Sequence, residues 1–302
     1  MSISHFIEKF YLGVWNVGII ERKAEELMQS DNNNLTIRWM KHSYRDRFFA
    51  DPFLYDADKE NYYLLVEEYP FWTNIGFISL LTVNRETMQI KKKEKLITSS
   101  YHLSYPFPYK GFVIPECYTS NKCVGYRVVD GKITSIKEFA QFGLIDQTFL
   151  EYDGYEWVFA TDKDNPLAGL KIFYRKRGTE DWIPHKKNPV SQDITTARPG
   201  GHFFMIGDSI YRPVQDSERL YGHQIHIMRV DLLNTEDYRE TIVKTFSSEN
   251  NPPFSMGFHT FNVEDGFIVV DGYREYCSMF VKPICVIFWK LKHIFNKKYN
   301  RE

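Results

Sequence analysis

Acidic, histidine and arginine side chains recur at the ends of short strand-like segments along this 302-residue sequence. Three acids stand out, because Asp51, Glu116 and Asp146 each lie at the edge of a different predicted hairpin. Carboxylates placed across a concave site suit sugar chemistry. One can act as nucleophile or base, a second with a raised pKa can protonate a leaving oxygen, and a third can orient ring hydroxyls.

Other polar side chains at the matching hairpin edges are expected to surround these acids. Arg198 and Arg212 could pair with them, or could hold a phosphate or a carboxylate-bearing sugar. Aromatic residues near the mouth of the central funnel, such as Tyr221, could stack on sugar faces. The residues predicted to bind substrate are Glu67, His102, Tyr105, Arg198, His202, Arg212, Gln215, Asp216 and His259.

Each candidate also has a structural interpretation. Asp51 precedes a proline and Asp146 lies two residues before Thr148, so both acids could cap turns and fix joints between repeated units. The arginines could form ion pairs within the fold. The histidines have no local spacing typical of a metal site, and no glycine-rich nucleotide-binding motif follows a strand. The sequence therefore predicts no metal and no cofactor.

The elements that carry these residues repeat. Five hairpins can be aligned on Phe53, Phe107, Phe149, Phe203 and Phe261, at intervals of 54, 42, 54 and 58 residues. Lys-Gly or Asp-Gly pairs separate the two strands of several hairpins, and such pairs favour tight hairpin turns. A long repeat with about four strands per unit is typical of a β-propeller. We therefore predict an all-β, five-bladed β-propeller over residues 1–276.

Composition narrows the choice of partners. Aromatic residues make up 17% of the chain, which favours strands, and the net charge of −1 gives no overall field for nucleic acid. The four cysteines lack metal-site spacing and are expected to be reduced. The first ten residues do not resemble a secretory signal, so a cytoplasmic protein is expected.

Residues 277–302 are predicted to form a short helical basic tail. A short apolar segment is followed there by lysines and an arginine. Such an amphipathic tail could lie on an anionic membrane, which would place the protein at its inner face. The alternative is a final helix packed on the propeller with a solvated basic face.

An ordered set of motifs resembles one family. The set comprises Trp15-Asn16-Val17-Gly18, Ala50-Asp51-Pro52-Phe53, His102 to Phe107, Ile114-Pro115-Glu116, Pro184-His185 with Asn188-Pro189, and Tyr211 to Asp216 with Tyr221-Gly222. It is similar to the N-terminal domain of plant glucosamine inositolphosphorylceramide transferases, which also occurs as a bacterial stand-alone or formyltransferase-fused module. The resemblance covers roughly residues 12–275. The plant glycosyltransferase domain is separate and C-terminal, so the resemblance does not imply that activity here.

A more distant resemblance is to the five-bladed furanosidase and fructosyltransferase clans. There an aspartate in the first blade, an aspartate in a middle blade and a glutamate form the active site. By position Asp51, Asp146 and Glu116 would take those places. This chain has Asp146-Gln147-Thr148 where Asp-Pro-Thr is expected, so the third-blade match is looser.

Two hypotheses follow. The first is an enzyme that cleaves or transfers a glycosyl unit in bacterial surface polysaccharide or glycolipid biosynthesis, with Asp51 as nucleophile or base, Glu116 as general acid and Asp146 as orienter. The second is a non-catalytic propeller that binds a glycan or sugar nucleotide beside a separate glycosyltransferase. A scaffold with an empty funnel is a third reading.

Overall fold

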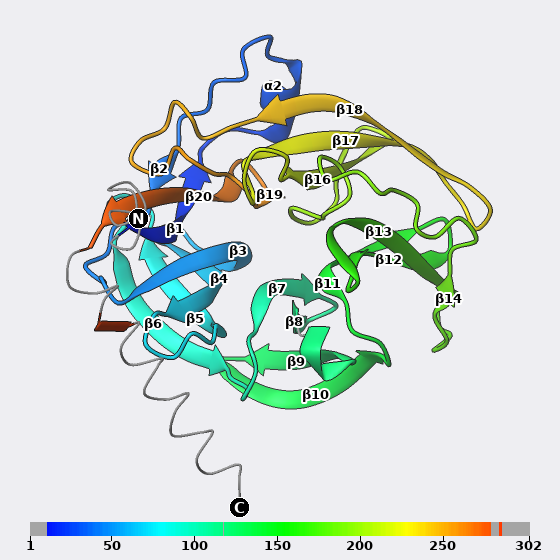
Figure 1. The fold of residues 1–302 in the computed structure, drawn as a ribbon, viewed down its shortest axis with the longest axis horizontal. Helices are drawn as coiled ribbons and strands as arrows, with labels where there is room; N and C mark the ends of the chain where they lie inside the picture. The colour runs from blue at the N-terminus through cyan, green and yellow to red at the C-terminus, as the bar shows by residue number, and fades with distance from the viewer. Residues whose placement is uncertain (1–10, 117, 279–283, 286–302) are drawn as a thin grey trace, which may run out of the picture.

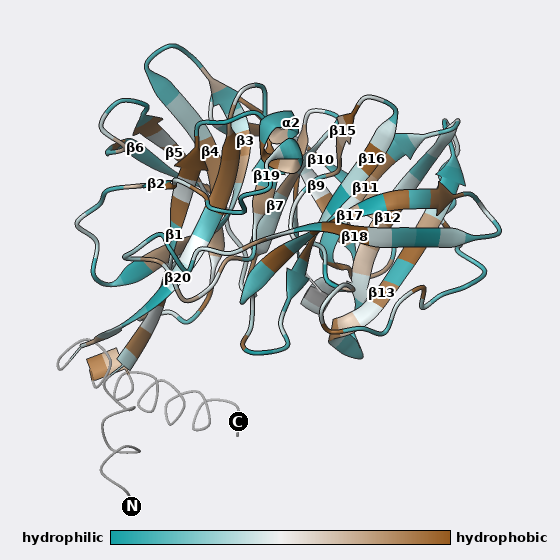
Figure 2. Ribbon diagram, turned by 90° about the horizontal axis from the view of Figure 1, so that it is seen from above, coloured by the Kyte–Doolittle hydropathy of each residue, from teal (hydrophilic) through white to brown (hydrophobic). Residues whose placement is uncertain are grey.

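The computed structural model describes residues 11–116, 118–278 and 284–285, and its strands form five antiparallel four-stranded sheets arranged as a ring (Figure 1). This confirms the predicted all-β, five-bladed propeller. Figure 2 shows that hydrophobic residues concentrate along the strands, whereas the connecting loops are largely hydrophilic.

Four blades are continuous in sequence, and the first strand of each lies nearest the axis. Blade I contains β3 (Arg47–Ala57), β4 (Asn61–Pro70), β5 (Phe77–Asn84) and β6 (Ile90–Ile97). Blade II contains β7 (Ser104–Tyr109), β8 (Phe112–Glu116), β9 (Cys123–Val129) and β10 (Lys132–Ala140), with a 3-10 turn, η2, at Tyr118–Ser120. Blade III contains β11 (Ile145–Tyr152), β12 (Tyr155–Asp162), β13 (Asn165–Lys176) and β14 (Ile183–Pro184). Blade IV contains β15 (Phe204–Ile206), β16 (Ser209–Asp216), β17 (Gln224–Leu233) and β18 (Tyr238–Phe246).

Blade V joins the two ends of the described chain. Its strand order is β19 (Phe261–Val263), β20 (Ile268–Cys277), β1 (Tyr11–Ile20) and β2 (Arg38–Trp39). Strands β1 and β20 pair along their whole lengths, from Tyr11↔Cys277 to Ile20↔Ile268. Helix α2 (Ala24–Gln29) lies in the connection between β1 and β2. The pairing of β1 with β20 closes the ring.

Apolar clusters hold neighbouring blades together. Phe53, Phe107 and Phe149 belong to one cluster that runs through blades I, II and III. Separate clusters join blade V to blade I, blade IV to blade V, and blade III to blade IV. The predicted turns are also present, since Lys110-Gly111 and Asp153-Gly154 have positive φ at both positions, as type I′ hairpin turns require.

The predicted tail, residues 277–302, lies mostly outside the described residues. Cys277 and Ser278 continue from β20, and Cys285 is buried in a cluster with Val14, Phe71 and Phe254. Within the described ranges, no helix has the length and hydrophobicity that crossing a membrane would need.

Candidate active site

The inner strands of three blades share an unusual backbone feature at the same position. Asp51, Tyr105 and Asp146 have φ angles of 49°, 42° and 49°, in the left-handed region. Each lies in a β-bulge, where the pairing shifts between Ala50 and Phe53, between Ser104 and Phe107, and between Ile145 and Thr148. Bulges re-aim side chains, and strained backbone concentrates at functional sites. The register also shows that Thr148, one residue before Phe149, is the structural counterpart of Phe53 and Phe107.

Each bulge residue donates its backbone N–H to a carboxylate from the preceding blade. Asp51 N–H donates to Asp271 Oδ2 (3.1 Å), and Tyr105 N–H donates to Asp51 Oδ2 (3.2 Å). Asp146 N–H donates to Glu116 Oε2 (3.2 Å). The acids therefore join blades V to I, I to II and II to III, which supports the structural interpretation without excluding chemistry.

Asp51 faces a histidine that a second carboxylate holds in place. His259 Nδ1 lies 2.7 Å from Asp271 Oδ2, and its Nε2 lies 3.7 Å from Asp51 Oδ1. Thr260 Oγ1 donates toward Asp271 Oδ2 (3.1 Å). The His259 ring stacks on Trp15, with centroids 3.7 Å apart and planes 9° from parallel. The imidazole is thus fixed between two acids and an aromatic face.

Burial and neighbouring charges shift the pKa values of Asp51 and His259. Burial raises the pKa of Asp51 to about 6, with His259 opposing the rise and Asp146 and Asp271 adding to it. Burial alone would lower the pKa of His259, but Asp271 and Asp51 together hold it above the ordinary value. At pH 7 Asp51 is therefore mostly ionised beside a histidine that favours its charged form.

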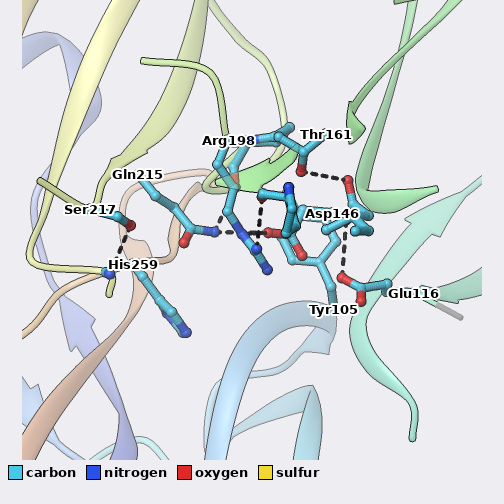
Figure 3. Close-up of polar contacts among 12 residues, drawn as sticks. Tyr105, Glu116, Asp146, Thr161, Arg198, Gln215, Ser217 and His259 are labelled. Atoms are coloured by element: carbon cyan, nitrogen blue, oxygen red, sulfur yellow. Dashed lines mark hydrogen bonds and ion pairs between the residues drawn. The ribbon is translucent and has the colours of Figure 1, made fainter. Parts of the chain in front are cut away.

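Asp146 has a different set of partners. Arg198 Nε lies 2.6 Å from Asp146 Oδ2, and Gln215 Nε2 donates to the same oxygen at 3.0 Å. Figure 3 shows Arg198 and Gln215 converging on Asp146, with Glu116 contacting its backbone from another direction. Arg198 also donates to the Tyr221 hydroxyl (3.3 Å), and the Tyr221 ring packs edge-on against His259. Tyr221 is 45% exposed and so lies at the solvent side of the group.

Burial shifts the pKa of both glutamates at this centre in the same direction. Burial raises the pKa of Glu116 well above its usual range, and the charge of Asp146 raises it further. Burial, with the charge of Asp51, raises the pKa of Glu67 in the same way. Glu67 and Glu116 face corresponding residues of β3 and β7, namely Ala50 and Ser104, so they are structural equivalents.

Glu67 is paired with His102. Gly76 N–H donates to His102 Nδ1 (3.0 Å), which leaves the proton of a neutral ring on Nε2, 3.3 Å from Glu67 Oε1. Burial lowers the pKa of His102. The two side chains therefore contact each other at the edge of the acid centre.

The remaining predicted substrate-binding residues lie elsewhere or beneath the centre. Tyr105 is fully buried and contacts Thr148 through its hydroxyl (2.9 Å). Arg212 is fully buried in an ion pair with Glu240. His202 contacts Glu264, and Asp216 contacts His226 and Gln224. The structure thus brings together Asp51, Glu67, Glu116, Asp146, Arg198, Gln215 and His259, with His102 at the edge, and we call these residues with Asp271 the acid centre.

Nothing in the sequence indicated that Trp15 or Thr260 belongs to the site, and Asp271 was indicated only as one of the polar residues at hairpin edges, without a role. Asp271 ends the apolar run of the last hairpin as Glu116 does in blade II, and this position was the available signal. Asp51, His259 and Asp271 also offer ligand atoms within 4.8 Å of one another. Both Asp271 oxygens already accept backbone N–H groups, and Oδ2 lies next to the imidazole, so this group fits a hydrogen-bond network better than a cation site.

Comparison with known families and proteins places this arrangement in context. The profile of the family described as glucosamine inositolphosphorylceramide transferase 1, N-terminal, matches residues 31–255. The protein of that name from Oryza sativa subsp. japonica is 32% identical over 215 residues, which is 66% of this chain and 28% of the relative. The Arabidopsis thaliana protein is 30% identical over 208 residues, or 65% of this chain and 27% of the relative. The chain thus spans under a third of these relatives.

Solved structures with a similar chain path include two glycoside hydrolases. A GH43_1 enzyme from Xanthomonas citri is 8% identical with a TM-score of 0.48, covering 76% of this chain and 87% of its own. A family 117 glycoside hydrolase from Zobellia galactanivorans is 10% identical with a TM-score of 0.43. The match covers 90% of this chain and 92% of the hydrolase chain.

Proposed function

This chain belongs to the family of glucosamine inositolphosphorylceramide transferase 1 N-terminal domains, and we propose that it is a carbohydrate-active propeller whose acid centre acts on a glycosidic bond. One observation carries the proposal. Two buried carboxyl groups lie in one centre, and burial raises the pKa of Asp51 to about 6 and the pKa of Glu116 well above its usual range. Separated pKa values of this kind assign an acid and a base.

The proposed chemistry follows from the pKa shifts of Glu116 and Asp51. Glu116 donates its proton to the leaving glycosidic oxygen as the bond to the anomeric carbon breaks. Asp51 either attacks that carbon or removes a proton from the incoming hydroxyl. His259, held by Asp271, keeps positive charge beside Asp51 and so favours its ionised form. Asp146, fixed by Arg198 and Gln215, orients sugar hydroxyls.

The wider setting is part of the proposal. We infer a sugar substrate in bacterial surface polysaccharide or glycolipid assembly, handled at the cytoplasmic face of the membrane and passed to or from a separate glycosyltransferase. Support comes from the relatives' name, which refers to glucosamine and a ceramide lipid, and from the basic sequence of residues 290–301. Co-purification with membranes, lost on deletion of residues 283–302, would test the location; unchanged partition would contradict it.

Asp51→Asn and Glu116→Gln test catalysis with little change of shape. Each amide keeps a carbonyl oxygen that can accept the Tyr105 or Asp146 N–H, so the blade joints should persist. Turnover of aryl glycosides or glycolipid acceptors should fall about 100- to 10,000-fold, as expected when a general acid or base is lost. Binding of the same sugars, followed by calorimetry, should survive. Asp216→Asn is the matched control, since Asp216 is a buried acid outside the centre.

A second candidate function is sugar binding without catalysis. The observation that favours it is the use of Asp51, Glu116 and Asp271 as joints between blades. In that case the wild-type protein binds sugars but turns none over, and both amide variants bind as it does. Wild-type turnover that both variants retain in full would defeat the enzyme proposal.

A further inference from the structure

A groove of about 1040 Å³ is lined by residues of blade V and the start of blade I. Its polar lining comes from β1, β20, the first residue of β3 and the segment 40–46 that connects β2 to β3. We call it the basic groove, defined by Asn16, Lys41, His42, Arg45, Arg47 and Arg274.

The charge of this groove contrasts with that of the whole chain. The protein has a net charge of −1, yet none of the described residues lining the groove is acidic, while four are lysine or arginine. Arg47 is neutralised by ion pairs with Asp46 and Glu68. Arg45 and Arg274 make no ion pair within the described part of the chain. A concave surface with unneutralised cations attracts anions.

The groove also contains buried polar atoms without partners among the described residues. They are Arg274 Nε, His42 Nδ1 and Asn16 Oδ1. Asn16 is 1% exposed, and its Nδ2 already donates to the Met40 carbonyl (2.8 Å). A buried polar atom left without a partner is destabilising, so these atoms point to a ligand that supplies one. The unpartnered atoms include a donor, Arg274 Nε, and an acceptor, Asn16 Oδ1.

Aromatic rings fix the key guanidinium without using its hydrogen-bonding edge. Arg274 Cζ lies 4.6 Å from the centre of the Phe254 ring and 5.7 Å from that of Tyr276. A guanidinium held in this way is preorganised for two-pronged contact with phosphate oxygens.

Trp15 is shared by the groove lining and the surroundings of His259. It lines the groove, and its indole stacks on the His259 ring of the acid centre. Gly222 and Gly257 leave room for the indole of Trp15, because a Cβ on either glycine would come within 3.2 Å of the indole. The side chains of Trp15 and Asn16 leave opposite faces of β1, so the indole faces His259 while Asn16 lies on the same face as Arg274.

We propose that the basic groove binds a phosphate group of a ligand that also carries a sugar or polyol. This inference goes beyond the proposed function and does not depend on it. Arg45 and Arg274 contact the phosphate oxygens, and Asn16 Oδ1 accepts a hydroxyl of the attached sugar or polyol. The phosphate belongs either to a soluble sugar phosphate or to a phospholipid headgroup.

Binding measurements with the full chain test the groove. The probes are inorganic pyrophosphate, followed by calorimetry, and phosphatidylcholine vesicles containing phosphatidylinositol, followed by sedimentation. We expect the wild type to bind at least one probe and Arg274→Ala to weaken that binding about tenfold or more, because charge-assisted contacts are lost. Binding of pyrophosphate alone supports a soluble source, and binding of vesicles alone supports a lipid source. Binding of neither probe overturns the proposal.

Two further variants make the test specific. Arg45→Ala lies on an exposed connecting segment, so it should weaken binding severalfold even if Arg274→Ala folds poorly. Arg239→Ala removes the same charge from an exposed position on β18 and should bind as the wild type does. Equal weakening by all three variants would overturn a specific site.

The amide variants separate this proposal from the proposed function. Asp51→Asn and Glu116→Gln should bind the phosphate probe as the wild type does. If the groove variants lose binding while the amide variants keep full turnover, the groove stands and the enzyme proposal fails. If the amide variants lose turnover while the groove variants keep full probe binding, the groove proposal alone fails.

Discussion

Asp51 and Asp146 occupy equivalent left-handed bulges in blades I and III, but their side chains contact different residue types. Asp51 faces an imidazole that another carboxylate holds, whereas Asp146 faces a guanidinium and an amide. The backbone device is common to both, and the partner differs. A propeller can thus present identical side chains from equivalent positions and assign them different chemical roles through residues supplied by other blades.

The largest effect should come from removing the acid that supports the Asp51 side. Asp271→Ala leaves the N–H groups of Asp51, His259 and Thr260 without their acceptor, inside a fully buried site. Because each orphaned donor costs about 1–3 kcal/mol, the free energy of unfolding should fall by about 5 kcal/mol. Urea denaturation measures it. The control is Asp265→Ala, in the exposed turn of the same blade, which should change the free energy of unfolding by less than about 0.5 kcal/mol. An equally small change in Asp271→Ala would show that Asp271 does not stabilise the contact between blades V and I.

On the Asp146 side the corresponding change is Arg198→Ala. It leaves a buried carboxylate with Gln215 as its remaining side-chain partner, so we expect a loss of about 3 kcal/mol. The control is Arg177→Ala, which breaks an exposed ion pair with Glu151 and should cost under about 1 kcal/mol. Equal losses in the two arginine variants would show that Asp146 does not depend on its guanidinium.

Asp51 should also make the free energy of unfolding depend on pH. Asp51 has a pKa of about 6 in the folded protein against 3.8 for an ordinary aspartate, so folding favours its protonated form. The resulting stability is fully present below pH 4 and is lost as pH rises through about 6, and a shift of this size corresponds to about 3 kcal/mol. Asp51→Asn should flatten the fall in unfolding free energy between pH 4 and 7. A slope equal to that of the wild type would contradict the assigned pKa.

The smallest effect on stability is expected at the bulge in blade II, where Tyr105 takes the place of an aspartate. Tyr105→Phe removes one hydrogen bond to Thr148, whose hydroxyl also donates to the Gly201 carbonyl (3.4 Å). We expect a loss of about 1 kcal/mol and no change in the pH dependence of unfolding. A loss as large as that of Arg198→Ala would mean that this bulge carries more than a structural contact.

Much of the architecture could be predicted because turns and strands depend on residues that are close in the sequence. Hairpin turns at Lys110-Gly111 and Asp153-Gly154, and the apolar runs around them, depend on neighbouring residues and indicate five blades. The closure of blade V is not local, because β1 pairs with β20 across almost the entire chain. The bulges were equally hidden from the sequence, and the alignment on Phe149 in place of Thr148 placed blade III one residue out of register.

The acid centre was predictable only in part for a related reason. Asp51, Glu116 and Asp146 stand at hairpin edges that the sequence marks, so their convergence follows from the repeat. Arg212 and Asp216 stand at a similar edge, yet Arg212 pairs with Glu240 and Asp216 contacts Gln224 and His226. Position along a strand fixes which end of the propeller a residue occupies, whereas side-chain direction and burial decide whether it reaches the axis.

The joining of β1 to β20 has a consequence for how the protein is made. During synthesis β1 emerges early and must wait, unpaired, until β20 leaves the ribosome. Contacts between such distant segments form late, because the entropy of closing so long a loop is lost before pairing compensates for it. Asp271 and Trp15 lie on these two strands, while His259 precedes β19 in the same blade. Nascent chains should therefore carry an incomplete acid centre. The complete centre should form in one step, when β1 pairs with β20 and closes the ring.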